Sequence, residues 1–383
     1  MSQFERLSPF IKEFIYRQGW TDLREMQDDA IRVILDGSED VLLAGATASG
    51  KTEAAFLPIL TALDRAPASS VGVLYIGPLK ALINDQFERL DALLSDAHIP
   101  VWPWHGDVSA SLKNRLLRKP SGVLQTTPES LEGFFVNRAH QLRPVFHDLR
   151  FVVIDEVHAF MASDRGRQVL CQLDRLQRAL GVRPRRVGLS ATLGDYALAE
   201  RWLAGGIQRE VVTLGDSAER RRLRLGLEHY VFAETNELPT DDENDFHNDL
   251  YRLTAGTKSL VFATSRGRVE EIGSSLRASA EKQGSPDIYH IHHGSISAQL
   301  RLAAEEAMRE PNKPACTVAT VTLELGIDLG QLERVVQVGA GPSVSSFVQR
   351  LGRTGRRGQP GEMYLITTED EPTAGSEPSD RIP

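Results

Sequence analysis

The sequence has few cysteines, no long apolar run and no excess of positive charge. Only two of its 383 residues are cysteines, Cys171 and Cys316. They form neither a disulfide framework nor a metal-ligand pattern, so we expect two inert buried thiols. No stretch approaches the roughly 20 consecutive apolar residues of a membrane span. The charged amino-terminal segment lacks the apolar core of a signal peptide, so we expect a cytoplasmic protein.

The net charge of -8 disfavours a protein that binds nucleic acid through bulk positive charge. It does not exclude a protein that holds a strand in a local groove through backbone amides, hydroxyls and a few basic side chains. The length suits two ordinary domains, and a hydrophobic content of 41% is enough for a globular core.

Short apolar runs alternate with longer helical patterns along the chain. In the first half, runs of Val, Ile and Leu predict buried strands at 40–44, 71–76, 123–124, 151–154 and 186–189. Helical patterns between them cover 52–65, 81–95, 109–117 and 165–179. This alternation predicts a parallel, doubly wound α/β domain.

A second series of strands follows, at 260–262, 288–291, 317–319, 335–338 and 363–366, again separated by helical patterns. The acidic stretch 234–248 is predicted to be a loop or the start of a solvated helix. We therefore expect two domains, residues 1–215 and residues 216–368. The polar residues 369–383 have the composition of a disordered tail.

The segment Gly45–Thr52 fits the phosphate-loop pattern G-x-x-x-x-G-K-[ST], between an apolar strand and a helix. A turn that merely needs glycine is the alternative, which this context disfavours. Backbone N–H groups of such a loop surround phosphate, so we expect Lys51 to reach the β- and γ-phosphates of ATP and Thr52 to coordinate Mg²⁺. The predicted nucleotide-binding residues here are Gly45, Thr47, Ala48, Ser49, Gly50, Lys51 and Thr52.

An acid pair, Asp155 and Glu156, ends the apolar run 151–154. Alone, such a pair is often a solvated turn. At the carboxyl end of a parallel strand it faces the phosphate crevice of an α/β domain. With the phosphate loop present, we expect Asp155 to hold Mg²⁺ and Glu156 to orient and deprotonate the attacking water.

These two elements resemble motifs I and II of the superfamily 2 helicases, in a DEVH variant (Asp155–His158) of the DEAD/DEAH-box pattern. The resemblance implies two tandem RecA-like lobes, each a parallel sheet, with a cleft between them. Ser190-Ala191-Thr192 resembles motif III, which couples hydrolysis to strand handling. Gln27 resembles the glutamine motif that reads adenine, and Arg24 lies where it could stack on or bond to the base.

In the second half, Gln349–Arg356 resembles motif VI, Q-R-x-G-R-x-G-R. The family assigns the arginine finger, which stabilises charge on the transferring phosphoryl group, to Arg353 and Arg356. Gln349 and Arg350 would then bridge to phosphate and to the other lobe. A basic loop that binds nucleic-acid phosphate is the alternative.

Other segments resemble the motifs that contact the nucleic-acid strand. Residues 77–82 resemble motif Ia, 126–130 motif Ib, 262–266 motif IV and 319–328 motif V, in which Asp328 would contact the ribose. Each segment alone could be a helix-capping signal. As an ordered set they predict sequence-independent phosphate contacts. The expected contact residues are Pro78, Lys80, Thr126, Thr127, Pro128, Thr264, Gly294, Thr320 and Thr322.

The motif sequences of the second half are similar to those of the large-helicase-related (Lhr-type) branch. That branch is mostly DNA-directed, translocates 3′ to 5′ and is linked to repair. It usually ends motif VI in Gly-His, where this chain has Gly355-Arg356. It also usually carries winged-helix and further domains, so we expect that strand separation needs a further domain or a partner.

We therefore expect an ATP-dependent helicase or translocase that binds nucleic acid, DNA rather than RNA. An RNA helicase is the alternative within this class. A nucleic-acid-stimulated ATPase that remodels complexes without unwinding is a second alternative. A nucleotide switch without turnover is a third, which the combination of Lys51, Glu156, Arg353 and Arg356 disfavours.

Overall fold

The chain divides into two compact units, unit 1 (Met1–Ala218) and unit 2 (Glu219–Pro383). The computed structural model describes residues 2–370 apart from 46–48, 95, 96, 98, 162, 191–194, 206–208, 216–222, 233–240, 312, 321, 322, 324–328, 330, 331, 342, 343 and 355–359. The domain boundary predicted at residue 215 falls three residues before this division. Among the described residues, no helix combines the length and the apolar character that crossing a membrane requires.

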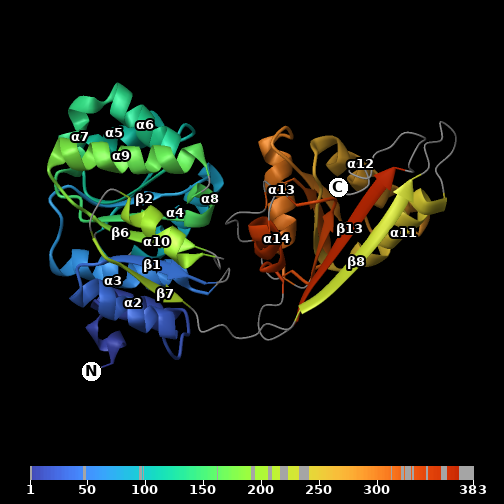
Figure 1. Cartoon of the computed structure of the whole chain (residues 1–383), viewed down its shortest axis with the longest axis horizontal. Coiled ribbons are helices and arrows are strands. Elements are labelled where there is room, and N and C mark those ends of the chain that lie inside the picture. The colour runs from blue at the N-terminus through green and yellow to red at the C-terminus, as the bar shows by residue number, and fades with distance from the viewer. Residues whose placement is uncertain are drawn as a thin grey trace. The chain divides into compact units, whose positions relative to one another are not determined.

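Unit 1 is a seven-stranded sheet with helices on both faces (Figure 1). Its strands are β1 (Asp40–Ala44), β2 (Val71–Ile76), β3 (Val101–Trp104), β4 (Gly122–Thr126), β5 (Phe151–Ile154), β6 (Arg185–Ser190) and β7 (Val211–Gly215). Its helices are η1 (Gln3–Arg6), α1 (Pro9–Arg17), α2 (Glu25–Asp36), α3 (Lys51–Arg65), α4 (Lys80–Leu94), α5 (Ala110–Arg118), α6 (Pro128–Asn137), η2 (Ala139–Gln141), α7 (Leu142–Phe146), α8 (Val157–Met161), α9 (Asp164–Leu180) and α10 (Tyr196–Ala204). The strand order is β3-β4-β2-β5-β6-β1-β7, and neighbouring strands pair in parallel.

Each central strand of unit 1 feeds two hydrophobic cores, because successive side chains point to opposite faces. In β5, Phe151 and Val153 pack in the core formed with α1–α4. Val152 and Ile154 pack in the core formed with α6–α10. A strand buried on both faces has no polar alternation, which explains why its apolar run was recognisable in the sequence.

Unit 2 is a six-stranded sheet of the same kind, with strand order β10-β11-β9-β12-β13-β8. Its strands are β8 (Leu223–Phe232), β9 (Lys258–Phe262), β10 (Tyr289–His292), β11 (Ala315–Ala319), β12 (Arg334–Val338) and β13 (Gly361–Asp370). Its helices are α11 (Asp241–Thr254), α12 (Arg266–Lys282), α13 (Ala298–Arg309) and α14 (Val344–Leu351). Two parallel-sheet α/β units confirm the predicted fold class.

One prediction at the end of the chain needs correction. Strand β13 continues to Asp370, so Glu369 and Asp370 belong to the sheet and not to the tail that we predicted from residue 369. Pairing with β8 holds them, since Asp370 lies opposite Phe232 in the ladder. The backbone hydrogen bonds of a ladder are available to polar residues as well as to apolar ones. Residues 371–383 lie outside the described part of the chain.

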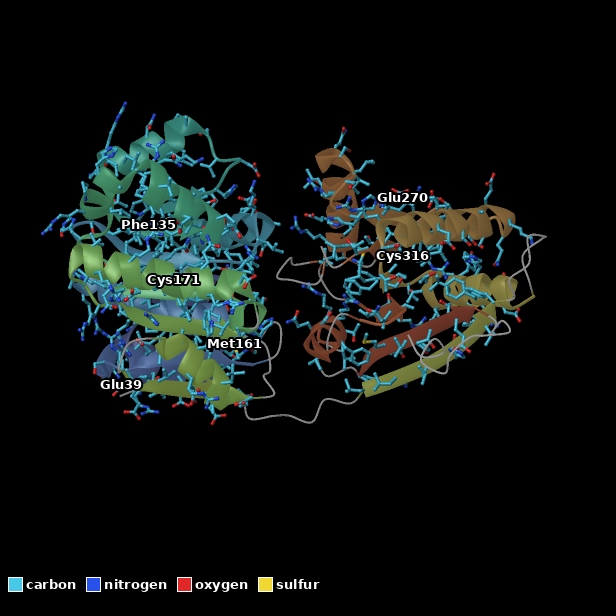
Figure 2. The ribbon with its side chains drawn as sticks, turned by 45° about the horizontal axis from the view of Figure 1, so that its top comes forward. Glu39, Phe135, Met161, Cys171, Glu270 and Cys316 are labelled. Carbon is cyan, nitrogen blue, oxygen red and sulfur yellow. The ribbon has the colours of Figure 1, made fainter. Side chains whose placement is uncertain are left out.

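The prediction of two buried thiols was right for one cysteine and wrong for the other. Cys316 is fully buried in β11, and burial raises the pKa of its thiol to about 12. Cys171 is exposed on α9 (Figure 2). The buried face of that helix is formed by Gly166, Val169, Gln172, Leu173 and Leu176, and residue 171 falls on its solvent side.

Candidate nucleotide and nucleic-acid sites

In unit 1 the predicted site residues follow the carboxyl ends of neighbouring strands. The register aligns these ends, because Trp104 and Ile76 both lie opposite Thr126, and Ile154 lies opposite Ile76. The phosphate loop follows β1, the acid pair follows β5 and Ser190 ends β6. The segments resembling motifs Ia and Ib follow β2 and β4. The strand order therefore places the nucleotide motifs on one half of this edge, β5-β6-β1, and the strand-binding motifs on the other, β3-β4-β2.

The phosphate loop turns sharply into α3 and is backed by the predicted adenine-reading residues. Gly50 is in the left-handed conformation (φ 85°), which glycine adopts without steric cost. A Cβ atom on Gly50 would lie 2.8 Å from Gln27 Nε2 and 3.6 Å from the Arg24 side chain, so both residues sit against the loop. The Lys51 ammonium donates a hydrogen bond to the carbonyl oxygen of Gly45 (2.7 Å). The fold thus brings Arg24 and Gln27 next to Gly50 of the phosphate loop.

Asp155 is a buried carboxylate that two donors hold in place. The Tyr75 hydroxyl donates to its Oδ2 atom, and the Glu156 backbone N–H donates to Oδ1 (2.8 Å). Burial and the neighbouring Glu156 charge raise the pKa of Asp155 to about 6, and the two hydrogen bonds and Lys51 oppose that rise. Burial raises the pKa of Tyr75 well above its usual range, so its hydroxyl remains a donor. Asp155 therefore has a fixed orientation at the end of β5.

Glu156 takes a strained backbone conformation that turns the chain from β5 into α8. It is the one non-glycine residue with positive φ (51°) in the described part of the chain. Such a conformation costs about 1 kcal/mol or more and is common at functional sites. Glu156 Oε2 lies 3.4 Å from His158 Nε2, and His158 Nδ1 lies 3.0 Å from Ser190 Oγ. His158 therefore connects the acid pair to the segment that resembles motif III.

On the other half of this edge, Lys80 begins α4 and is half exposed. Its ammonium pairs with Asp107, at 3.0 and 3.2 Å from the two carboxylate oxygens. Next to Asp107, the buried His105 shares a 2.9 Å hydrogen bond with Asn84. Burial lowers the pKa of His105. Pro78, which precedes Lys80, is buried, and its carbonyl oxygen accepts a hydrogen bond from Arg165.

The segment that resembles motif Ib has more structural roles than we predicted. Thr126 is fully buried, and its hydroxyl donates to the Trp104 carbonyl oxygen (2.9 Å). We therefore assign Thr126 to the packing of the sheet and no longer to phosphate contact. Thr127 is the N-cap of α6, where its hydroxyl oxygen accepts from the Ser130 N–H (3.4 Å), and Pro128 is the first helical residue. These are the capping roles that Ser, Thr and Pro favour at a helix start.

In unit 2 the predicted strand-binding residues also follow neighbouring strand ends. Thr264 follows β9, Gly294 follows β10 and Thr320 follows β11, in the strand order β10-β11-β9. Thr264 and Gly294 are exposed, and Thr320 is half-buried. Beside them, His292 Nε2 lies 3.2 Å from Glu305 and His293 Nε2 lies 3.1 Å from Glu270. In the described part of the chain, no group of three or more His, Cys, Asp or Glu side chains could hold a metal ion.

Three polar side chains of motif VI are buried in unit 2. Gln349 is 9% exposed, Arg350 2% and Arg353 3%. Arg350 donates to the Gln337 side-chain oxygen, and its guanidinium lies 4.2 Å from the centre of the Phe262 ring. It therefore fixes α14 on the sheet, a role that we did not predict. Several predicted residues lie outside the described part of the chain, namely Thr47, Ala48, Ala191, Thr192, Thr322, Asp328, Gly355 and Arg356.

Sequence reasoning missed Tyr75, His105 and Arg165. The signal for Tyr75 is its place in an otherwise apolar strand, since a buried tyrosine hydroxyl needs a hydrogen-bond partner. His105 and Arg165 have no comparable signal. Their partners are Asn84, Pro78 and Glu129, which are far from them in the sequence.

Comparison with known proteins agrees with this geometry. The DEAD/DEAH box helicase family matches residues 24–199, and the helicase conserved C-terminal domain matches residues 244–358. The ATP-dependent helicase Lhr-Core of Methanothermobacter thermautotrophicus is 32% identical over 92% of this chain and 42% of that protein. The chain therefore belongs to the DEAD/DEAH box helicases of superfamily 2.

Two solved structures of helicases bound to DNA are similar to this chain. Mycobacterium smegmatis helicase Lhr, bound to ssDNA and AMP-PNP, is 31% identical (TM-score 0.79) over 96% of this chain and 48% of that one. The DUF1998 helicase MrfA bound to DNA is 25% identical (TM-score 0.79) over 98% of this chain and 49% of that one. The chain is of the Lhr-type branch. It spans about half the length of these structures and less than half of Lhr-Core.

Proposed function

We propose that the chain is the motor core of an ATP-dependent DNA helicase or translocase. The observation that carries this proposal is the division of one sheet edge in unit 1. Phosphate-loop and acid-pair residues occupy one half, and the motif Ia and Ib segments occupy the adjoining half. In such an arrangement, a nucleotide and a nucleic-acid strand both bind at the carboxyl ends of the same β-sheet. The DNA in the structures of Lhr and MrfA supports DNA as the nucleic acid.

The proposed chemistry assigns one task to each residue of the nucleotide site. Lys51 and the N–H groups at the start of α3 bind the phosphates. Gln27 lies against the phosphate loop and has a side-chain N–H group to offer the base, while its Oε1 accepts from the Arg24 N–H (3.0 Å). Glu156, at a strained turn beside Asp155, orients the attacking water and accepts its proton.

Mg²⁺ fits the donors that the site contains. Asp155 offers a carboxylate held by two hydrogen bonds, and Thr52 offers a hydroxyl in the first turn of α3. Mg²⁺ in phosphoryl-transfer sites is bound by hard oxygen donors, usually one or two carboxylates, with substrate phosphates and water completing the set. The absence of a larger carboxylate cluster among the described residues is compatible with such a site. When bound, the ion would supply positive charge to the phosphate oxygens.

Unit 2 would stabilise the charge on the transferring phosphoryl group and provide a second set of contacts with the nucleic-acid strand. We assign Arg353 and Arg356 to the transferring phosphoryl group, a task that can be worth about 10³–10⁵ in rate. Thr264, Gly294 and Thr320 follow adjacent strands of one parallel sheet, so they can share one strand of nucleic acid. In unit 1, Lys80 and the α6 amino terminus would contact the phosphates of the nucleic-acid strand.

The steady-state ATPase rate with Mg²⁺ tests the proposal, measured alone, with single-stranded DNA and with single-stranded RNA. We expect strong stimulation by DNA and little by RNA. Lys51→Ala should abolish turnover and shows that any measured rate belongs to this site. Stimulation by RNA alone would replace the DNA assignment. Strong DNA stimulation without strand displacement would indicate a translocase that remodels complexes.

A further inference from the structure

Helix α9 begins where the two halves of the functional edge meet, and it carries an arginine there. The Arg165 guanidinium donates to the Pro78 carbonyl oxygen (2.7 Å). It also donates to both carboxylate oxygens of Glu129 (2.6 and 3.1 Å). Pro78 belongs to the motif Ia segment after β2, and Glu129 to the motif Ib segment after β4. One side chain therefore joins a loop and a helix start that are 51 residues apart in the sequence.

The same arginine also contacts the helix that follows the acid pair. Its guanidinium lies 5.8 Å from the centre of the Phe160 ring in α8. Helices α8 and α9 pack closely, because a Cβ atom on Gly166 would lie 2.0 Å from the Phe160 carbonyl oxygen. Only glycine fits at that contact. A displacement of α8, which begins directly after Glu156, must therefore move the start of α9.

Further along α9, a second residue ties the helix to the motif Ib segment. The Gln172 side chain donates to the Pro128 carbonyl oxygen (2.8 Å) and to Glu132 of α6 (2.9 Å). Figure 2 labels one residue on each of the three helices concerned, Phe135 on α6, Met161 on α8 and Cys171 on α9. Helix α9 is thus fixed to α8 at its start and to α6 along its first half.

Local helix energetics do not explain an arginine at this position. Arg165 is in the first turn of α9, where the helix dipole disfavours a positive charge. Its neighbour Arg167 pairs with Asp164 on the surface of the same turn and is 81% exposed. A lysine could not replace Arg165, because a single ammonium cannot bind a carboxylate in two-point fashion and a carbonyl oxygen at once.

We propose that Arg165 is a positioning residue that couples the nucleotide site to the strand-binding segments of unit 1. It transmits the position of α8, set at the acid pair, to the backbone around Pro78 and to the start of α6. The motif Ia segment and the start of α6 then change their contacts with the nucleic-acid strand together. This inference rests on the proposed function and deepens it, since it names the contact through which ATP and DNA would influence each other.

The test measures how strongly nucleotide changes DNA affinity. Binding of fluorescent oligo(dT) is followed by fluorescence anisotropy with Mg²⁺, with and without AMP-PNP, and the two Kd values give a coupling ratio. In Arg165→Ala we expect that ratio to move toward one by about two- to thirtyfold, the usual range for a residue that carries coupling. Arg167→Ala, from the same turn, should leave the ratio unchanged. A merely structural role would reduce the fraction of active protein, which lowers the signal amplitude but not the ratio.

A second variant covers the case in which Arg165→Ala does not fold. Glu129→Gln removes the charged partner at a half-exposed position, and it should lower the ratio in the same direction. The double variant Arg165→Ala/Glu129→Gln should be no worse than Arg165→Ala alone, because both changes break one link. An unchanged ratio in Arg165→Ala, or in Glu129→Gln where the former is unfolded, would overturn the inference. A wild-type ratio of one would instead overturn the proposed function.

Discussion

The sheet of unit 1 has an amino edge, where its strands begin, and a carboxyl edge, where its strands end. These two edges hold charged side chains in different ways. At the amino edge, Asp40 is fully buried and accepts from the Arg186 backbone N–H (2.7 Å) and from Arg209 (2.9 Å). There Arg185 donates to the carbonyl oxygens of residues 33, 34, 37 and 39. At the carboxyl edge, Asp155 has a raised pKa and Glu156 has a strained backbone.

The difference between the two edges shows how functional charged residues can be told from structural ones. At the amino edge opposite charges and carbonyl oxygens stabilise one another, which is a contribution to stability. At the carboxyl edge two acids lie side by side, and the charge of Glu156 disfavours ionisation of Asp155. Such an arrangement costs stability and persists at sites that bind cations or activate water. Changes at the carboxyl edge should therefore affect turnover more than folding, and changes at the amino edge should do the reverse.

The largest expected effect is the loss of turnover in Glu156→Gln. Removing a general base costs about 10²–10⁴ in rate, and the amide keeps nearly the same shape. We expect kcat to fall by that factor with little change in the midpoint of urea unfolding. Glu13→Gln, at an exposed position of α1, is the matched control. Normal turnover in Glu156→Gln would remove the residue from the mechanism. It would also contradict the assignment of the carboxyl edge to turnover.

At the amino edge, Asp40→Ala should lower stability and leave turnover nearly unchanged. Removing one partner of a buried charge pair leaves the other without compensation and costs about 3 kcal/mol or more. We expect the free energy of unfolding to fall by that amount, measured by urea denaturation. The rate per folded molecule should stay close to that of wild type. Asp64→Ala, at an exposed position of α3, should change stability much less.

A second amino-edge group allows a test by pH. Hydrogen bonds from Arg150, and further ones from Ser69, lower the pKa of Asp148 to about 2, against the effect of burial. A depressed pKa gives stability that is present above the usual value of 3.8 and is lost as pH falls through about 2. Asp148→Asn should therefore be less stable than wild type by about 2 kcal/mol at neutral pH. That difference should shrink steadily below pH 4, and a pH-independent difference would contradict the ion-pair explanation.

The smallest effect is expected for Tyr75→Phe at the carboxyl edge. It removes one hydrogen bond to Asp155 and leaves the ring packed beside Phe56, whose centre is 6.1 Å away. One such bond is worth about 1 kcal/mol, or roughly a fivefold change in an equilibrium. We expect the Mg²⁺ concentration for half-maximal ATPase activity to rise by about that factor. An unchanged Mg²⁺ requirement would show that the Tyr75 hydroxyl serves packing alone.

Much of unit 1 was predictable because its central strands are buried on both faces. The strands at 40–44, 71–76 and 151–154 match β1, β2 and β5 as the structure has them. The strands that escaped prediction, β3, β7 and β8, lie at the edges of their sheets. An edge strand needs no continuous apolar run. In β3 the run Val-Trp-Pro-Trp even contains a proline, which edge strands tolerate.

The sequence by itself determined the family, the fold class and the identity of the phosphate loop and acid pair. These depend on local order, because a loop that surrounds phosphate must have its glycines, lysine and threonine at fixed spacing. Only the tertiary structure decided which hydroxyls are available. It buried Thr126, whose hydroxyl donates to the Trp104 carbonyl oxygen, and turned the Tyr75 hydroxyl toward Asp155. It also placed Arg165 between the motif Ia segment and the start of α6, which the strand order brings together although they are distant in the sequence.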